Sequence, residues 1–265
     1  MTTPSSHAER ALGATDEFEA AEEQAESRSR MSFLDHLDEL RRRILYSLYA
    51  VLACCAVTFY YWERLFDFYV AYFGAHGGNL MYSQPMSGFM FSLKLSALAA
   101  VIVAAPFIFS QVWLFVAPGL YAREKRVVLP FVFFSSVLFF SGAYFAHALG
   151  YPYMWRFFAG YQRTGLQFLP ALDTAFALYV KVILGMGLAF QLPVLVFWLS
   201  RFGLISARFL IRKFKYAMLI IVIAAAVITP SGDPMTLVVF SAPMVVLYVV
   251  SIGVAWLFGK KRDDD

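Results

Sequence analysis

The 265-residue chain has few charged residues, and most of its length has almost none. Only 15% of its residues are charged, whereas 60% are hydrophobic, a balance far from that of a water-soluble domain. Between Arg43 and Lys260 there are only five acidic residues. The uncharged stretches are long enough to cross a bilayer core about 30 Å thick, which takes about 20 helical residues. The composition therefore predicts an all-α integral membrane protein.

Residues that carry chemistry in enzymes are also scarce. The chain contains no His-Glu-x-x-His and no Gly-x-Ser-x-Gly motif, and its four histidines are scattered. Its two cysteines, Cys54 and Cys55, are adjacent in the first apolar run. Neighbouring positions on a helix point in different directions, so the two thiols are poor disulfide partners. We therefore predict a protein that is not an enzyme and that holds no metal and no cofactor.

Six apolar stretches are predicted to span the membrane. They cover residues 44–62, 88–113, 126–148, 174–199, 214–230 and 236–258. The fifth is short, because Lys215 and Pro230 bracket only 14 residues, and a bilayer must thin to accommodate it. Asp233, which follows it, is interpreted as a turn-former next to Pro234. The number of spans is even, so both ends of the chain are expected on the same side.

The segments between the spans differ in charge and in aromatic content. Basic residues near the spans number sixteen on one side and three on the other, and the positive-inside rule therefore predicts that both termini are cytoplasmic. The two outward segments, 63–87 and 149–173, are rich in aromatic residues and glycine. Tyr and Trp favour the membrane–water interface, so these side chains are interpreted as interfacial belts.

The two ends of the chain are the only strongly charged parts. Residues 1–30 carry seven acidic residues against three arginines, which predicts a disordered acidic cytoplasmic tail rather than a cleavable signal peptide. Residues 31–258 are predicted to form the six-span domain with a leading amphipathic helix. Residues 259–265 are predicted to be a charged cytoplasmic tail.

The segment Met31–Arg43 has the pattern of a short amphipathic helix in front of the first span. Ser32 and Asp35 have the spacing of a capping box, which predicts a helix start there. Its apolar residues recur along one helical stripe at Phe33, Leu37, Leu40 and Ile44. An acidic helix joined to a membrane anchor is a surface suited to bind a cationic ligand.

Two carboxylates, Glu39 and Glu124, lie close to the membrane on the predicted cytoplasmic side. The structural interpretation is that Glu39 pairs with Arg43 at i, i+4 and that Glu124 stabilises the first turn of the third span. The functional interpretation is that the two acids bind two guanidinium groups bidentately, which lysine would do less well. Both interpretations stay open for the residues alone.

Polar residues inside the spans offer a second candidate site. Lys94, Lys181 and Gln191 could form the midplane site of a small-solute transporter, although both lysines are close enough to span ends to snorkel. Gln191 precedes Pro193, whose missing N–H frees a backbone carbonyl at depth in the membrane. Gln191 could therefore bond a partner protein's helix, or be satisfied within the chain.

The motifs, taken in order, resemble the TatC family, the receptor subunit of the twin-arginine protein translocase. The resemblance rests on residues 33–43, on 94–106 and 111–121 with Glu124, and on 190–193 and 229–233. It covers residues 31 to about 258 and keeps the family's order and spacing. Gln191 stands where several relatives have glutamate, and Ser110 stands where an aromatic residue is usual.

The resemblance implies a six-span, glove-shaped bundle and a defined set of ligands. Twin-arginine signal peptides of folded cargo would be recognised by Glu39 and Glu124, with Arg41 and Phe115 as neighbours. Partner subunits of the TatA and TatB types, which have a single span, would dock at Gln191 and Pro193. The resemblance further implies export driven by the proton motive force across a bacterial or archaeal cytoplasmic (inner) membrane, in a multimeric complex with membrane lipid and without nucleic acid.

Overall fold

The computed structural model describes residues 36–76, 80–82, 84–116, 125–161, 169–229 and 233–259. The chain divides into two compact units, Met1–Leu48 and Tyr49–Asp265. Within the described residues every regular secondary-structure element is a helix, and the one β feature is an isolated bridge between Met81 and Ala171. The predicted all-α class is confirmed.

The spans predicted from the sequence are present as helices. Five stretches are long and apolar enough to cross a membrane: His36–Tyr60, Ser87–Phe115, Leu129–Ala159, Leu172–Arg201 and Pro234–Phe258. The sixth, Phe214–Ile228, is apolar but shorter, as expected for the fifth predicted span. Cys54 and Cys55 are free thiols in the first of these helices.

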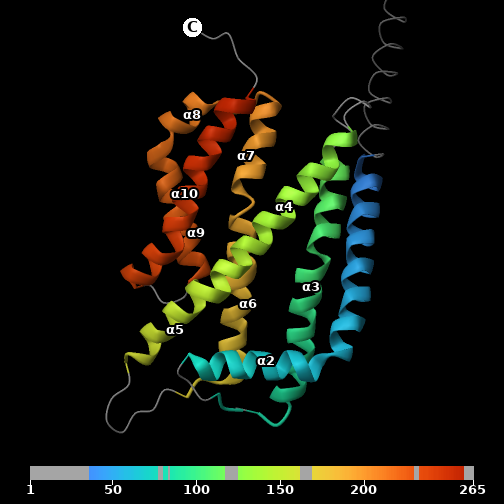
Figure 1. Cartoon of the computed structure of the whole chain (residues 1–265), viewed down its shortest axis with the longest axis vertical. Coiled ribbons are helices and arrows are strands. Elements are labelled where there is room, and N and C mark those ends of the chain that lie inside the picture. The colour runs from blue at the N-terminus through green and yellow to red at the C-terminus, as the bar shows by residue number, and fades with distance from the viewer. Residues whose placement is uncertain are drawn as a thin grey trace, which may run out of the picture. The chain divides into compact units, whose positions relative to one another are not determined.

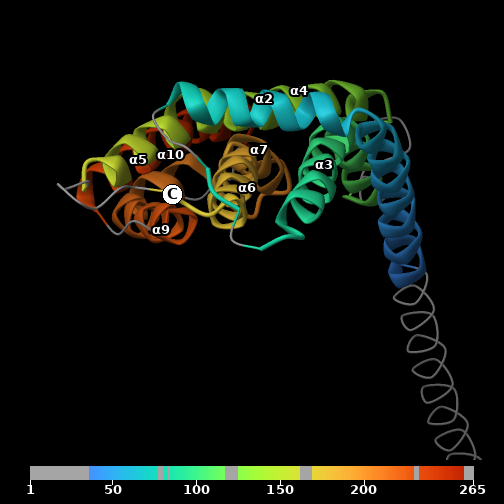
Figure 2. The same cartoon turned by 90° about the horizontal axis from the view of Figure 1, so that it is seen from below.

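Besides the end of the helix His36–Tyr60, the second unit contains ten helical elements in the described residues. They are α2 (Trp62–Ala75), α3 (Ser87–Val116), α4 (Lys125–Phe145), the π-helix η3 (Ala146–Gly150), α5 (Tyr151–Ala159), α6 (Leu172–Ala189), α7 (Leu192–Arg201), α8 (Ala207–Arg212), α9 (Phe214–Ile228) and α10 (Pro234–Phe258). The α6–α7 span lies between α3 on one side and the α9–α10 pair on the other (Figures 1 and 2). The α4–η3–α5 span crosses it diagonally (Figure 1).

Helix α2 runs across the ends of the spans instead of along them (Figure 1). It covers the N-terminal turns of α3 and α6, where the Tyr69 ring lies 5.1 Å from that of Phe91 and 5.7 Å from that of Phe176. Farther along, its Phe73 ring lies 4.5 Å from that of Trp155. Tyr69 is 2% exposed and Trp155 is 3% exposed. The interfacial-belt interpretation is therefore wrong for these residues, which form the core beneath α2.

Helices α4 and α6 cross in close contact at two glycines. A Cβ atom on Gly142 would lie 2.6 Å from the carbonyl oxygen of Met186, and one on Gly187 would lie 2.7 Å from the ring of Phe139. Both distances are shorter than van der Waals contact. At Gly142 the close atom belongs to the backbone, so a larger residue would require movement of the helices, whereas at Gly187 the ring of Phe139 would have to shift. Small residues at helix crossings are the usual means by which membrane helices approach each other. This crossing fixes how the C-terminal part of α4 meets the C-terminal part of α6.

A single π-helical turn, η3, joins α4 to α5 in one continuous span. Its residue His147 accepts a hydrogen bond at its carbonyl oxygen from the hydroxyl of Tyr72 on α2. The imidazole Nδ1 of His147 lies 2.9 Å from the hydroxyl oxygen of Tyr179 on α6. At the end of the turn, a Cβ on Gly150 would lie 2.8 Å from the ring of Phe240 on α10. The π turn is thus held by three neighbouring helices.

Local sequence signals set the ends of α7 and α10. Gly203, just after α7, has φ of +74°, a left-handed conformation that glycine adopts without strain. Asp233 is the N-cap of α10, and its carboxylate accepts a hydrogen bond of 2.7 Å from the backbone N–H of Thr236. Pro234 occupies the first turn of that helix, where its missing N–H costs nothing. Asp233 is thus the N-cap of α10, and the turn predicted for it at residues 230–234 lies partly outside the described residues.

Candidate functional site

Glu39, the first predicted ligand of a guanidinium group, lies in the described part of the first unit. Its carboxylate oxygen Oε1 is 3.2 Å from Nη2 of Arg43 one turn later, and the side chains are 29% and 26% exposed. The i, i+4 pair expected from the sequence is therefore present. A depression on this helix is lined by Asp38, Glu39, Arg42 and Arg43. Glu39 is accessible, and its present partner is itself a guanidinium group.

Of the other three residues predicted to bind the signal peptide, two lie within the described part of the chain. Arg41 is exposed on the same helix as Glu39, and Phe115 is half-buried in the last turns of α3. Glu124 lies outside the described residues. Glu39 belongs to the first compact unit and Phe115 to the second. The convergence of the two carboxylates on one ligand thus remains a prediction.

Gln191, the predicted docking residue, lies at a break in the middle of the fourth long span. Helix α6 ends at Ala189, and α7 begins at Leu192 with Pro193 in its first turn. The Gln191 carbonyl accepts the first backbone bonds of α7, from the N–H groups of Val194 at 3.1 Å and Leu195 at 3.0 Å. Proline has no N–H to continue the ladder of α6, so the helix restarts here. From the sequence, only the carbonyl freed by Pro193 was predicted, and the end of one helix and start of another at this point were not.

The side chain of Gln191 reaches across to α4. Its Nε2 donates a hydrogen bond of 2.9 Å to the backbone carbonyl of Ser135. The hydroxyl oxygen of Ser135, a fully buried residue, accepts one of 2.9 Å from the indole Nε1 of Trp113 on α3. These two bonds form a polar bridge, Trp113–Ser135–Gln191, that connects three spans. The alternative that Gln191 forms its hydrogen bonds within the chain is thus true for one of the two N–H donors of its amide.

The polar bridge still has unused hydrogen-bonding capacity. A glutamine amide carries two N–H donors and a carbonyl acceptor. Among the described residues, the second N–H and the carbonyl oxygen of Gln191 have no hydrogen-bond partner. The residue is only half-buried, so these atoms remain reachable. A polar atom without a partner is costly inside a membrane. The site can therefore accept a polar group from another helix.

Aromatic rings surround the polar bridge. The rings of Trp113 and Trp198 stack with centroids 5.3 Å apart, and Phe131 lies 4.9 Å from Trp198 and 4.6 Å from Phe197. These contacts join α3, α4 and α7. Trp113 and Ser135 were not predicted from the sequence as members of this site. The signal for Ser135 was the pair Ser135–Ser136 in a mostly apolar span.

Lys94 and Lys181 do not join Gln191 in a common site. The Nζ atom of Lys94 is 3.3 Å from Oδ1 of Asp173, in the first turn of α6. Gln191 follows the opposite end of that helix, which is 18 residues and therefore about 27 Å long. The side chain of Lys181 is exposed. The alternative of a midplane transporter site is wrong, because its three residues do not converge.

Comparisons with known proteins agree on one family. The family described as Sec-independent protein translocase protein (TatC) matches residues 35–243. A TatC protein from Koribacter versatilis is 41% identical over 240 residues, covering 88% of each chain. One from Helicobacter pylori is 38% identical over 230 residues, covering 87% of this chain and 91% of its own.

Solved structures give the same result for the fold. A crystal structure titled twin arginine translocase receptor TatC superimposes with a TM-score of 0.72 at 30% sequence identity. The match covers 83% of this chain and 97% of that one. A second structure with the same receptor name, in the detergent DDM, gives a TM-score of 0.74 at 29% identity.

Proposed function

The chain belongs to the TatC family, and from that premise we propose that it is the receptor that binds twin-arginine signal peptides of folded proteins. It is a membrane-spanning, non-enzymatic component of the Sec-independent protein translocase, and it functions in a complex with other Tat subunits. We further propose which residues bind the signal peptide of the cargo and which partner subunits dock.

The observation that carries the peptide-binding proposal is Glu39 in an accessible ion pair with an arginine. A carboxylate that already binds the guanidinium of Arg43 has the chemistry to bind the guanidinium of a peptide arginine in its place. Glu124 supplies the second carboxylate, so that each acid binds one of the two arginines. Arg41 and Phe115 border the peptide. The planar, forked guanidinium fits a carboxylate better than the ammonium of lysine does.

Peptide binding by the purified full chain tests this proposal. A synthetic twin-arginine signal peptide is expected to bind at least about tenfold more tightly than the same peptide with two lysines, because bidentate pairing is lost. Fluorescence anisotropy with a labelled peptide measures both affinities at one salt concentration. Equal affinities would contradict specific guanidinium recognition, because both peptides carry the same charge.

Partner docking is assigned to Gln191 and Pro193. The break in the span exposes an amide with unused donor and acceptor atoms, and single-span subunits of the TatA and TatB types would bring a helix with a polar residue to it. An interhelical hydrogen bond of this kind contributes about 0.6–2 kcal/mol. We also propose that both chain ends lie in the cytoplasm, that the membrane is the bacterial or archaeal cytoplasmic (inner) one, and that export uses the proton motive force.

Gln191→Leu is expected to weaken capture of a TatB-type subunit about three- to thirtyfold, since the free amide atoms are lost. Gln191→Glu should retain most of the capture, because a carboxyl group keeps the acceptor. Lys181→Gln, at an exposed side chain in the same span, is the matched control and should behave as wild type. Quantitative co-purification from membranes measures all three. If the Gln191→Leu variant captured the subunit as fully as wild type does, Gln191 would not be part of the docking site.

A further inference from the structure

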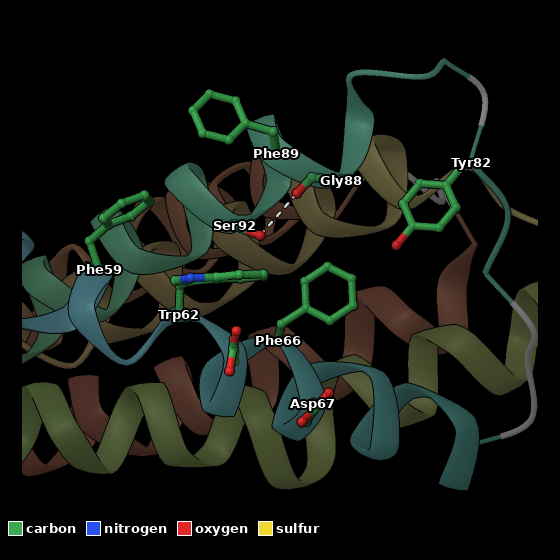
Figure 3. Close-up of a pocket in the computed structure, with 9 residues that line it drawn as sticks. Phe59, Trp62, Phe66, Asp67, Tyr82, Gly88, Phe89 and Ser92 are labelled. Carbon is green, nitrogen blue, oxygen red and sulfur yellow. Dashed lines mark hydrogen bonds between the residues drawn. The ribbon is translucent and has the colours of Figure 1, made fainter.

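A groove lies between α2 and the first turns of α3. Its volume is about 700 Å³. Figure 3 shows the rings of Trp62 and Phe66 between the two helices, with Tyr82 beside them. The residues that line it are Phe59, Trp62, Glu63, Phe66, Asp67, Tyr82, Gly88, Phe89 and Ser92. None of the roles proposed above uses this groove.

The groove lies where two spans end. Phe59 is in the last turn of the span His36–Tyr60, and Phe89 is in the first turn of the span that begins at Ser87. Trp62 and Tyr82 are 39% and 60% exposed, and such side chains favour the level of the lipid headgroups. Phe59 and Phe89 are 37% and 55% exposed. The groove therefore has an apolar flank at the depth where headgroups give way to acyl chains.

The charged residues among the described lining of the groove are both acidic. Glu63 and Asp67 are one turn apart on α2 and exposed, and neither forms an ion pair with any described residue. The guanidinium of Arg64, between them in sequence, instead lies 5.5 Å from the ring centroid of Tyr61. None of the described residues that line the groove is a lysine or an arginine. Two free carboxylates beside aromatic rings are the chemistry that binds an organic ammonium ion.

We propose that this groove binds the ammonium headgroup of a zwitterionic aminophospholipid of the phosphatidylethanolamine type. The carboxylates of Glu63 and Asp67 accept hydrogen bonds from the ammonium, and the ring of Trp62 contributes a cation–π contact. The acyl chains lie along Phe59 and Phe89. An ethanolamine ammonium has three N–H donors and a choline has none, so the carboxylates favour ethanolamine. This lipid site is independent of signal-peptide binding and of partner docking.

Competitive lipid retention by the delipidated full chain tests the proposal. The protein in detergent is mixed with equal amounts of palmitoyl-oleoyl phosphatidylethanolamine, phosphatidylcholine and phosphatidylglycerol, and native mass spectrometry counts the lipids that stay bound. The acyl chains are the same, so any preference comes from the headgroup. We expect phosphatidylethanolamine to be retained about tenfold more than phosphatidylglycerol, with phosphatidylcholine between them.

Variants then locate the site. Glu63→Gln with Asp67→Asn should remove the headgroup preference, a loss of about tenfold, and both side chains are exposed, so folding is retained. Trp62→Leu should reduce it about threefold. Asp38→Asn removes the same charge outside the groove and should change nothing. An unchanged preference in the double variant overturns the proposal. The proposal is also overturned if the double variant retains lipid as the wild type does but no longer binds an arginine- and leucine-rich model peptide. That result would assign the groove to a cationic peptide.

Discussion

Replacing Glu39 and Glu124 together by glutamine is expected to reduce the affinity for a twin-arginine peptide by about 100-fold. A charge-assisted hydrogen bond to an arginine is worth about 1.5–3 kcal/mol, so each carboxylate accounts for at least about tenfold. Glutamine keeps the size of the side chain and removes its charge. Fluorescence anisotropy of a labelled peptide on the purified chain gives the affinities of the single and double variants.

The ion pair with Arg43 makes this prediction sharper. A peptide guanidinium must displace the Arg43 guanidinium, which lies 3.2 Å from Oε1 of Glu39. Arg43→Gln leaves the carboxylate without this competitor, and we expect the peptide to bind about twofold more tightly. Asp38→Asn, one residue from Glu39 and exposed, is the matched control and should lose less than twofold. Equal losses in Asp38→Asn and Glu39→Gln would mean that the peptide senses general charge rather than one carboxylate.

Gly142→Ala is expected to destabilise the fold by about 2–3 kcal/mol, although it adds a single methyl group. The added Cβ would lie 2.6 Å from the carbonyl oxygen of Met186 and 2.8 Å from Cγ of Phe190. A backbone carbonyl cannot rotate away, so α4 and α6 must separate and their packing is lost. Thermal unfolding in detergent should show a decrease in Tm of roughly 5–10 °C.

The same substitution at Gly253 provides the control. A Cβ there has no atom within 4 Å, so Gly253→Ala in α10 should leave Tm unchanged or slightly raised, since alanine favours helix. Separation of α4 from α6 should also weaken the 2.9 Å hydrogen bond from Gln191 to Ser135, because it joins the same two segments. An unchanged Tm for Gly142→Ala would contradict the close crossing of these helices.

The helical spans could be predicted because a bilayer leaves the chain little choice. Backbone groups in the membrane must bond within a helix, so each long uncharged stretch becomes one. The freed carbonyl before Pro193 could be predicted from the missing proline N–H, but the break at Gln191 could not, because Pro106, Pro130 and Pro243 lie inside helices that continue through them. The short fifth span followed directly from Lys215 and Pro230, and it corresponds to α9.

The aromatic core beneath α2 could not be predicted by composition. Tyr and Trp near the end of a span are equally compatible with a lipid interface and with a buried contact, and only the path of the chain decides. Here α2 turns across the spans, and Tyr69, Phe73 and Tyr151 become at most 2% exposed. A hydropathy pattern contains no information about which helix covers which.

The polar bridge depended on contacts between residues far apart in the chain. Ser136 donates its hydroxyl to the carbonyl of Val132 one turn earlier, as serine in a membrane helix commonly does. The adjacent Ser135 instead accepts a bond from Trp113, 22 residues away, and its carbonyl accepts one from Gln191, 56 residues away. Nothing in the local sequence distinguishes the two serines. Their different roles follow from the crossing of α4 with its neighbours.

The π-helical turn at Ala146–Gly150 rotates the second half of the long span about the helix axis relative to the first half. Each residue of an α-helix turns the chain by about 100°, and a π turn accommodates one extra residue in the ladder. The face that carries Gly142 meets α6, whereas after the turn Tyr151 and Trp155 face the core beneath α2. Both faces therefore keep their contacts only if the number of residues between Gly142 and Tyr151 is unchanged. A deletion of one residue there would rotate α5 as a whole and expose its aromatic side chains to lipid, even though every helix kept its hydrophobicity.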